Sequence, residues 1–416
     1  MLVPTELAIP RTIVLTGHFP PASGGVQTFT FELLRRLPAD RLGVVAPYHP
    51  DARRVDATLD FPVYRRHGYL LTTQLGRVVE EFGATTGWIT AAAPFGLFAP
   101  ALRRAGVTRI VASSHGQELG WLHVAPTRWA MRNVVRSVDT FTYLTDYTRD
   151  QLYPVLRHAD ALAQLHGGVD TARFRPGAGG ELVRRLLGLG DRPTVISLSR
   201  LVRRKGHDML LRAWPQVRRR VPGATLLIVG EGPMRRELQR LADGPAMGGS
   251  VLIIGRLPAA EVPAYLDAAN VFVLPCRDNR GGLQSEGLGL AVLEASATGL
   301  PVVVGRSGGS REALLDDRTG HLVDGRDPAS IADALVGLLN DPVRASRMGD
   351  HGRRWVSERW TWPAAALRLA ALLRGARIPA AGAVDLAARP GAVRPGMANP
   401  GPPESTAAES VPDRQH

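Results

Sequence analysis

The chain has 416 residues, 44% of them hydrophobic and 21% charged, which allows two or three domains and excludes a wholly disordered protein. Its one cysteine, Cys276, excludes an internal disulfide, and no apolar stretch approaches the ~20 residues that cross a bilayer. Residues 1–10 lack the features of a secretory signal. We therefore expect a cytoplasmic protein.

Basic residues outnumber acidic ones by 51 to 38, a net charge of +13. Residues 1–173 carry 18 basic against 14 acidic residues, residues 174–374 carry 29 against 20, and residues 375–416 carry 4 of each. This surplus favours an anionic ligand or surface. Because no run of five basic residues and no zinc-finger or RNP-like pattern accompanies it, we expect no nucleic-acid partner. A non-catalytic basic nucleic-acid-binding protein is the alternative from another class.

Short β-branched runs alternate with amphipathic helical stretches along the chain. Residues 12–19 read as a buried strand, followed by a Pro/Gly loop and a helix with one apolar face: Val26, Phe29, Leu33, Leu34 and Leu37. Further strands are predicted at 42–46, 87–90, 109–113 and 140–144. After residue 174 the alternation restarts, with strands predicted at 194–199, 225–230, 251–255, 271–275, 301–305 and 321–323.

Continuous apolar strands between helices are typical of parallel sheets covered on both faces. We predict an α/β protein with two doubly wound, Rossmann-like domains, at 1–173 and 174–360, that face each other across a cleft. A helix at 361–374 is expected to pack back on the N-terminal domain, and the Ala-, Pro- and Gly-rich residues 375–416 to form a disordered tail. Ligands are expected in the cleft, at the carboxyl ends of the strands.

Two loops at predicted strand ends suit an anionic phosphate. Gly24 and Gly25 open a helix, where backbone N–H groups bind anions, although tight-turn geometry alone explains such a pair. In SRLVRRKG, Lys205 is the only lysine among the 51 basic residues, which indicates that a compact point charge is needed there. A solvated basic loop is the alternative. Arg200 and Lys205 are expected to neutralise a diphosphate.

Three further side chains are candidates for contact with a ligand. Glu286 and Glu294 lie eight residues apart in SEGLGLAVLEASATG, about 12 Å along the axis if the segment is helical. That separation is too wide for the carboxylate pair of a glycosidase, so we expect contacts with different parts of one long ligand. Favourable helix-end charge for Glu286 and a solvated face for Glu294 are the alternatives. His115, in SSHGQE, follows the strand at 109–113 and can contact a ligand hydroxyl or be structural.

No Asp-x-Asp pair and no His/Cys cluster is present in the sequence. A divalent metal bound to a diphosphate normally needs carboxylate ligands. We therefore expect no metal.

Together these segments resemble the retaining, metal-independent GT-B glycosyltransferases of family 4, from about Thr12 to Leu373. The motifs are FPPASGGVQ, the HGxE segment, SRLVxRKG, the E-x7-E segment EGLGLAVLE and SGGSRE. Within the family, SRLVRRKGHDML, SEGLGLAVLEA and RWVSERWTW are most similar to the PimB-type GDP-mannose-dependent phosphatidylinositol mannoside mannosyltransferases. The resemblance implies transfer of mannose from GDP-mannose to such a glycolipid without a further cofactor. A UDP-sugar-dependent family 4 enzyme with a soluble acceptor, and an epimerase-like or phosphorolytic enzyme, are the alternatives.

The resemblance also implies a role for each candidate residue. Gly24 and Gly25 approach the donor diphosphate, which Arg200 and Lys205 neutralise. Glu294 holds the ribose, and His115 contacts the transferred sugar. Sugar hydroxyls bind to Glu286 and to the backbone amides of Leu288, Gly289 and Leu290, and the base faces Arg256 and Leu257.

The sequence departs from the family pattern where the acceptor is expected to bind. Gly17 and His18 stand where relatives often have Asn-Asp, and Gln117 where they often have His. A lipid acceptor implies peripheral docking at the anionic inner face of the plasma membrane. Residues 126–137 place Trp129 and Met131 among arginines that would contact headgroups, and an ordinary helix covering the sheet is the alternative.

Overall fold

The computed structural model describes residues 5–22, 24–67, 71–279 and 284–378. It contains two sheets in which every pair of neighbouring strands is parallel, in the orders β3-β2-β1-β4-β5-β6-β7 and β10-β9-β8-β11-β12-β13. Both orders reverse direction at the first strand of the sheet, as in doubly wound α/β domains. Contacts between Cα atoms place both sheets in one compact unit, Met1–Ala380. The predicted α/β architecture is confirmed.

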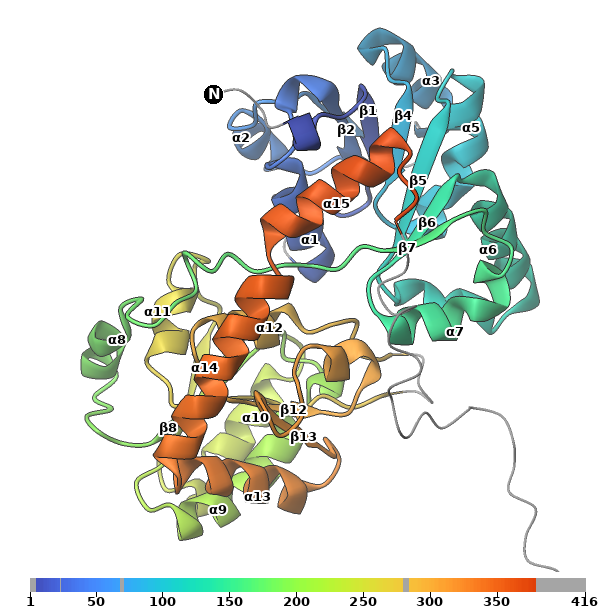
Figure 1. Ribbon diagram of the computed structural model, residues 1–416. Helices are drawn as coiled ribbons and strands as arrows, with labels where there is room; N and C mark the ends of the chain where they lie inside the picture. The colour runs from blue at the N-terminus through green and yellow to red at the C-terminus, as the bar shows by residue number, and fades with distance from the viewer. Residues whose placement is uncertain (1–4, 23, 68–70, 280–283, 379–416) are drawn as a thin grey trace, which may run out of the picture. The chain divides into compact units, whose positions relative to one another are not determined.

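The first sheet and its helices come from the first half of the chain (Figure 1). The strands are β1 (Thr12–Leu15), β2 (Leu42–Pro47), β3 (Val63–Arg66), β4 (Thr86–Ile89), β5 (Arg109–Ser114), β6 (Thr140–Tyr143) and β7 (Leu162–Gln164). The α-helices are α1 (Gly25–Leu34), α2 (Ala52–Asp56), α3 (Leu71–Phe82), α4 (Ala92–Phe95), α5 (Ala99–Arg104), α6 (Ala125–Ser137) and α7 (Asp146–Leu156). One expected strand was too long, since β1 ends at Leu15 rather than at residue 19. Two strands, β3 and β7, were not predicted.

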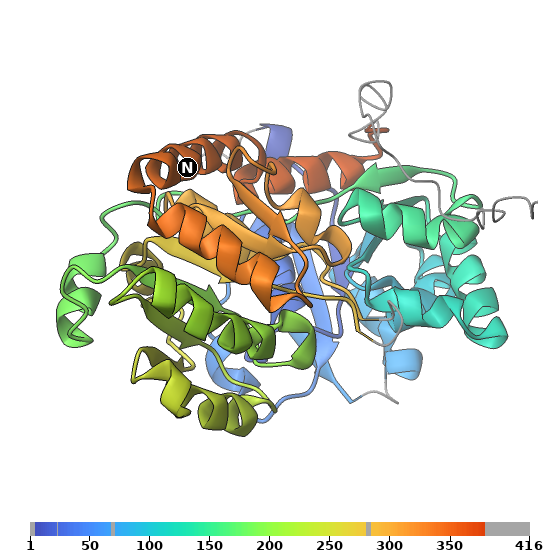
Figure 2. The ribbon, with the colours of Figure 1, turned by 90° about the horizontal axis from the view of Figure 1, so that it is seen from below.

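The second sheet follows the predicted strands closely. Its strands are β8 (Thr194–Leu198), β9 (Thr225–Val229), β10 (Val251–Gly255), β11 (Val271–Leu274), β12 (Val302–Gly305) and β13 (Gly320–Val323). The helices are α8 (Gly180–Leu186), α9 (His207–Arg220), α10 (Arg235–Ala242), α11 (Val262–Asp267), α12 (Leu290–Ala297), α13 (Pro328–Leu339), α14 (Pro342–Arg359) and α15 (Trp362–Arg374). Figure 2 shows α9 and α13 side by side over this sheet, where their leucines and isoleucines share one core with its valines.

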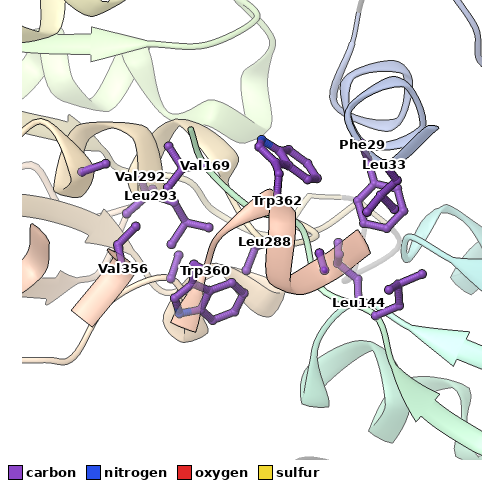
Figure 3. Close-up of a cluster of buried hydrophobic side chains, with 14 of the residues drawn as sticks. Phe29, Leu33, Leu144, Val169, Leu288, Val292, Leu293, Val356, Trp360 and Trp362 are labelled. Atoms are coloured by element: carbon purple, nitrogen blue, oxygen red, sulfur yellow. The ribbon is translucent and has the colours of Figure 1, made fainter. Parts of the chain in front are cut away.

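One apolar core connects the two halves. Figure 3 shows Trp362, at the start of α15, between Phe29 of α1 and the side chains of α12. The rings of Phe29 and Trp362 are 6.1 Å apart, edge to face, and the Val169 N–H donates to the Trp360 carbonyl at 2.8 Å. Because α15 contacts α1, β4 and β5, this last helix returns to the first sheet. Burial of these aromatic rings therefore stabilises the association of the halves.

Helix α6 covers the first sheet and keeps one polar face. Met131 is fully buried, so our expectation that it contacts headgroups was wrong: at that position the helix faces the core. Trp129 is 66% exposed. Among the described residues, no helix is both long and apolar enough to cross a bilayer. The predicted disordered tail, 375–416, lies outside the described residues from 379 onward, and Gly375 ends α15 in the left-handed conformation.

Candidate functional site

A cleft of about 1530 Å³ lies between loops that follow strands of both sheets. Its walls include residues after β1 and β5 of the first sheet and after β8, β9 and β11 of the second. This is the position where open parallel sheets bind ligands. All of the predicted site residues line the cleft except Glu294. Ser23 of the FPPASGGVQ motif lies outside the described residues, and so do residues 280–283, which come shortly before the SEGLGLAVLEA segment.

Two helices present their N-termini to the cleft. Helix α1 starts after Gly24, and α12 starts after Gly289, which takes the left-handed φ of 90° that suits glycine. Neither residue has a side chain that could cap the helix, and α12 starts only at Leu290. The first N–H groups of both helices, with the positive ends of the helix dipoles, are therefore available to an anion.

An ion cluster around Glu286 lies in the cleft wall. Glu286 Oε2 is 2.6 Å from Lys205 Nζ and 2.5 Å from the Arg204 guanidinium, and both Glu286 and Lys205 are buried. Although burial by itself raises the pKa of Glu286, the two cations lower it below its ordinary value. Glu286 is therefore ionised at neutral pH, and a single carboxylate oxygen is shared by two cations.

The loops on either side hold this cluster in place. Gly206, directly after Lys205, has a φ of 78°, and a Cβ there would lie 1.9 Å from the Pro275 carbonyl oxygen. The Arg277 guanidinium pairs with buried Asp208 at 2.7 Å, and the Arg277 N–H donates to the Arg204 carbonyl at 2.8 Å. The segment that carries both cations is thus fixed against the loop after β11.

The SGGSRE loop supports Glu286 from the other side. The Gly309 N–H donates to the Glu286 carbonyl at 2.8 Å, and the Glu286 N–H donates to Ser307 Oγ at 3.2 Å. Glu312 of this loop accepts hydrogen bonds from the Asp146 and Tyr147 N–H groups of α7, at 3.0 and 2.9 Å. The loop therefore ties Glu286 to the first half of the molecule.

Arg200 reaches the cleft from the end of β8. Its side chain is exposed and makes no hydrogen bond or ion pair with any residue that the structure describes. Arg256 and Leu257 line the same cleft after β10. Arg200 is therefore a cation that a ligand can engage without breaking an internal ion pair.

His115 is buried at the end of β5 in a defined tautomer. Its Nε2 is 2.7 Å from the Thr90 carbonyl, which can only accept, so Nε2 carries the proton and Nδ1 is a hydrogen-bond acceptor. Burial lowers the pKa of His115 to about 4, and nearby His18 lowers it too, against the effect of the Thr90 carbonyl. Glu118 Oε2 accepts from the His115 N–H at 3.2 Å and fixes the backbone. His115 is therefore neutral at physiological pH.

Glu294 differs from the other candidates because it does not line the cleft. It lies in α12, on the face that carries the cleft residues Leu290 and Ala291, four and three positions earlier. Burial raises its pKa to about 7, with nearby Arg173 opposing and Glu32 reinforcing the shift. Glu286 precedes α12, which starts only after Gly289, so the spacing of about 12 Å that we gave for the case of a helical segment does not apply between the two carboxylates.

Arg204, His18 and Tyr147 are among the cleft residues that we did not predict. Arg204 pairs with Glu286, and its position in the SRLVRRKG motif, next to Lys205, could have identified it as a site residue. His18 lines the cleft beside His115, and its departure from the family pattern pointed to it. Tyr147 lines the cleft too, and its hydroxyl is 3.1 Å from Ser285 Oγ, a contact between segments 138 residues apart that local pattern cannot reveal.

Two family models match successive parts of the chain. "Glycosyltransferase Family 4" matches residues 23–173, and "Glycosyl transferases group 1" matches residues 182–355. The chain is also 43% identical over 379 residues to the GDP-mannose-dependent alpha-(1-6)-phosphatidylinositol monomannoside mannosyltransferase of Mycolicibacterium smegmatis, covering 88% of this chain and 98% of that protein. The chain belongs to the family 4 glycosyltransferases. The resemblance inferred from the motifs is confirmed.

Other relatives and solved structures agree with this family. A GDP-mannose-dependent monoacylated alpha-(1-6)-phosphatidylinositol monomannoside mannosyltransferase of Corynebacterium glutamicum is 36% identical over 375 residues, 88% of this chain and 98% of that protein. The crystal structure of Anabaena HepE with UDP and glucose superposes with a TM-score of 0.76 at 17% identity, covering 88% and 100% of the two chains. Sucrose-phosphate synthase of Thermosynechococcus elongatus gives a TM-score of 0.69 at 21% identity, covering 88% and 98%. These likenesses confirm the GT-B fold.

Among the described residues of this glycosyltransferase, one group of side chains has ligand atoms close enough together to hold a metal ion, and this group lies outside the cleft. Asp316, Asp317 and His321 could together hold an ion, but they lie at or near the surface and none of them lines the cleft. The charged residues that line the cleft are Arg200, Arg203, Arg204, Lys205, Glu231, Arg256 and Glu286.

Proposed function

We propose that this glycosyltransferase moves mannose from GDP-mannose to a phosphatidylinositol mannoside-type glycolipid, with retention of the anomeric configuration and without a metal ion. The observation that carries the proposal is the 43% identity to a mannosyltransferase of that name over 98% of its length. The cleft supports it, since fixed cations and two helix N-termini suit a diphosphate.

The diphosphate is bound first by charges that are already in place. Arg200 and Lys205, with the N-terminus of α1 at Gly24 and Gly25, neutralise the phosphate oxygens as the bond to the sugar breaks. A preorganised cation stabilises a leaving anion without having to reorganise during the reaction. The released phosphate oxygen then accepts the proton of the acceptor hydroxyl, which attacks from the same face of the sugar.

The remaining walls of the cleft contact the sugar and the nucleoside. Glu286 accepts from sugar hydroxyls and the N–H groups of Leu288, Gly289 and Leu290 donate to them. His115 Nδ1 accepts a further hydroxyl, which its neutral tautomer allows. Arg256 and Leu257 face the base. Glu294 does not line the cleft, but it lies on the same face of α12 as the cleft residue Leu290, and we propose that it contacts the ribose from there.

The donor and the acceptor are tested together by product analysis. Purified protein is incubated with radiolabelled GDP-mannose or UDP-sugars, with and without phosphatidylinositol monomannoside. Transfer from GDP-mannose, with an α-linked product, is expected. Transfer only from UDP-sugars, or release of sugar 1-phosphate, would falsify the mannosyl assignment.

We further propose that the face formed by α6 and α7 docks on an anionic membrane. Trp129 and Tyr153 are 66% and 62% exposed. Desolvation and the nearby charges of Arg136, Arg157 and Arg132 lower the pKa of His158, so three arginines lie near this histidine. Exposed aromatic rings beside arginines suit the interface of a bilayer that contains anionic lipid.

Vesicle flotation tests this docking face. Binding to vesicles with phosphatidylinositol, weak binding to phosphatidylcholine alone, and loss of binding in Trp129→Ala/Arg136→Glu are expected. Val343→Ala, an equally exposed apolar position (68%) on α14, is the matched control and should bind like wild type. Equal binding of the wild type and the double variant rules out this face, and binding of DNA in place of vesicles favours a nucleic-acid partner.

A further inference from the structure

His18 occupies a loop that is shaped to present it to the cleft. The loop follows β1, and Thr16 Oγ1 accepts from the His18 N–H at 3.0 Å and donates to the His18 carbonyl at 3.2 Å. A Cβ at Gly17 would lie 2.2 Å from the Phe95 ring, so glycine is needed before His18 for Phe95 to pack there. Gly17 and His18 thus form one local structure.

The same hydrogen-bond network holds His115. Thr90 Oγ1 donates to Thr16 Oγ1 at 2.8 Å, and the Thr90 carbonyl accepts from His115 Nε2 at 2.7 Å. Both imidazoles line the cleft, and each is close enough for the charge of His18 to lower the pKa of His115. The ends of β1 and β4 therefore position two histidines as a pair.

The ring nitrogens of His18 have no partner in the described part of the chain. Nδ1 is buried without a hydrogen bond, whereas Nε2 is not among the fully buried atoms, so the Nε2 edge is the one open to the cleft. Burial lowers the pKa of His18. A neutral imidazole with an open edge suits a hydroxyl group, since it can donate to or accept from one.

We propose that His18 hydrogen-bonds, through its Nε2 edge, a hydroxyl of the polyol ring of the acceptor and so contributes to acceptor specificity. This rests on the proposed function, in which the donor takes most of its contacts from the second half of the chain, and on the expectation that the acceptor binds beside Gly17 and His18. His115 contacts the transferred sugar, so the histidine pair lies across the junction of donor and acceptor. His18 acts in positioning and takes no part in bond cleavage.

Steady-state kinetics with a soluble mannosyl-inositol headgroup tests this role without interference from membrane binding. Because a neutral hydrogen bond contributes about 0.5–1.5 kcal/mol, His18→Ala should raise the KM for the headgroup about 2- to 13-fold. The KM for GDP-mannose should stay within about twofold. His18→Gln, whose amide reaches the Nε2 position, should restore most of the acceptor affinity, and His18→Asn, whose amide reaches only Nδ1, should not. His351→Ala, an exposed histidine on α14, is the matched control.

The outcomes separate this inference from the function on which it rests. Three results would overturn the role of His18: an unchanged acceptor KM in His18→Ala, a parallel rise in both KM values, or equal behaviour of the Gln and Asn variants. Transfer by the wild type would still uphold the proposed function in each case. Absence of transfer by the wild type overturns both. An acceptor analogue that lacks the bound hydroxyl should lose affinity for the wild type and not for His18→Ala.

Discussion

Replacement of Lys205 by alanine separates a catalytic from a structural role for the cation cluster. Lys205 Nζ is 2.6 Å from Glu286 Oε2. At an effective dielectric constant of ~20 the attraction over that distance is about 6 kcal/mol, and desolvation of both groups offsets most of it. Because Arg204 still pairs with Glu286, the variant should lose about 1.5–3 kcal/mol of unfolding free energy, less than the ~3–5 kcal/mol of an unpaired buried charge.

The loss of activity in Lys205→Ala should be larger than the loss of stability. Removal of one preorganised group from a developing anion typically costs about 10²–10³-fold in turnover. We therefore expect kcat for mannosyl transfer to fall about 100- to 1000-fold in a protein that still unfolds cooperatively in urea. Lys205→Arg should recover part of this activity, since it keeps the charge but replaces a compact ammonium by a planar guanidinium.

Two further variants make the test of the cluster decisive. Arg204→Ala removes the other partner of Glu286 and should show a similar loss of stability with a smaller loss of kcat. The double variant Lys205→Ala/Arg204→Ala leaves Glu286 buried and unpaired, so its stability should fall by more than the sum of the single effects. A folded Lys205→Ala protein that keeps more than about a tenth of the wild-type kcat refutes the electrostatic assignment.

Three other outcomes are expected. Transfer should survive EDTA, since the proposed neutralisation uses arginine and lysine; complete loss that Mg²⁺ restores contradicts this. Burial raises the pKa of Glu294 to about 7 in the native state, so its ionisation destabilises the fold as pH rises between about 4.5 and 7. Glu294→Gln should therefore melt above the wild type at pH 8 and with it at pH 4, and a constant difference argues against this pKa. Trp362→Ala, which removes the ring packed on Phe29, should lower the unfolding free energy by about 3–5 kcal/mol in urea titrations.

Most of the predicted strands are runs of buried residues: β1, β4, β6, β9, β11 and β12 are buried along their whole length. The edge strands β10 and β13 of the second sheet are partly exposed and were still predicted from their apolar residues. The two that escaped, β3 and β7, are the edges of the first sheet. Strand β3 contains two arginines in four partly exposed residues and β7 has only three residues, so neither shows the pattern of a buried strand.

Sequence patterning located the site residues that come after predicted strands. It could not identify residue pairs that form through contacts between distant segments. Gly24, Lys205 and His115 each come directly after a strand or loop that sequence patterning located. The pairing of Arg204 with Glu286 joins positions 82 residues apart, and spacing along the chain carries no information about it. The helical spacing assumed for Glu286 failed because Gly289, in the left-handed region, sets the start of α12.

The proposed function uses fixed cations to neutralise a diphosphate, and these cations need a counter-charge when no ligand is bound. Cations buried without a counter-charge are costly, and the carboxylate of Glu286 pairs with both Lys205 and Arg204 in the cleft wall. An incoming diphosphate brings its own negative charge to Lys205, while Arg204 can keep its pair with Glu286. The carboxylate then has oxygen lone pairs to accept from sugar hydroxyls. In the proposed function, Glu286 is thus the counter-ion of two buried cations before the donor binds and accepts sugar hydroxyls once it is bound. This double role explains why one carboxylate oxygen is shared by two cations.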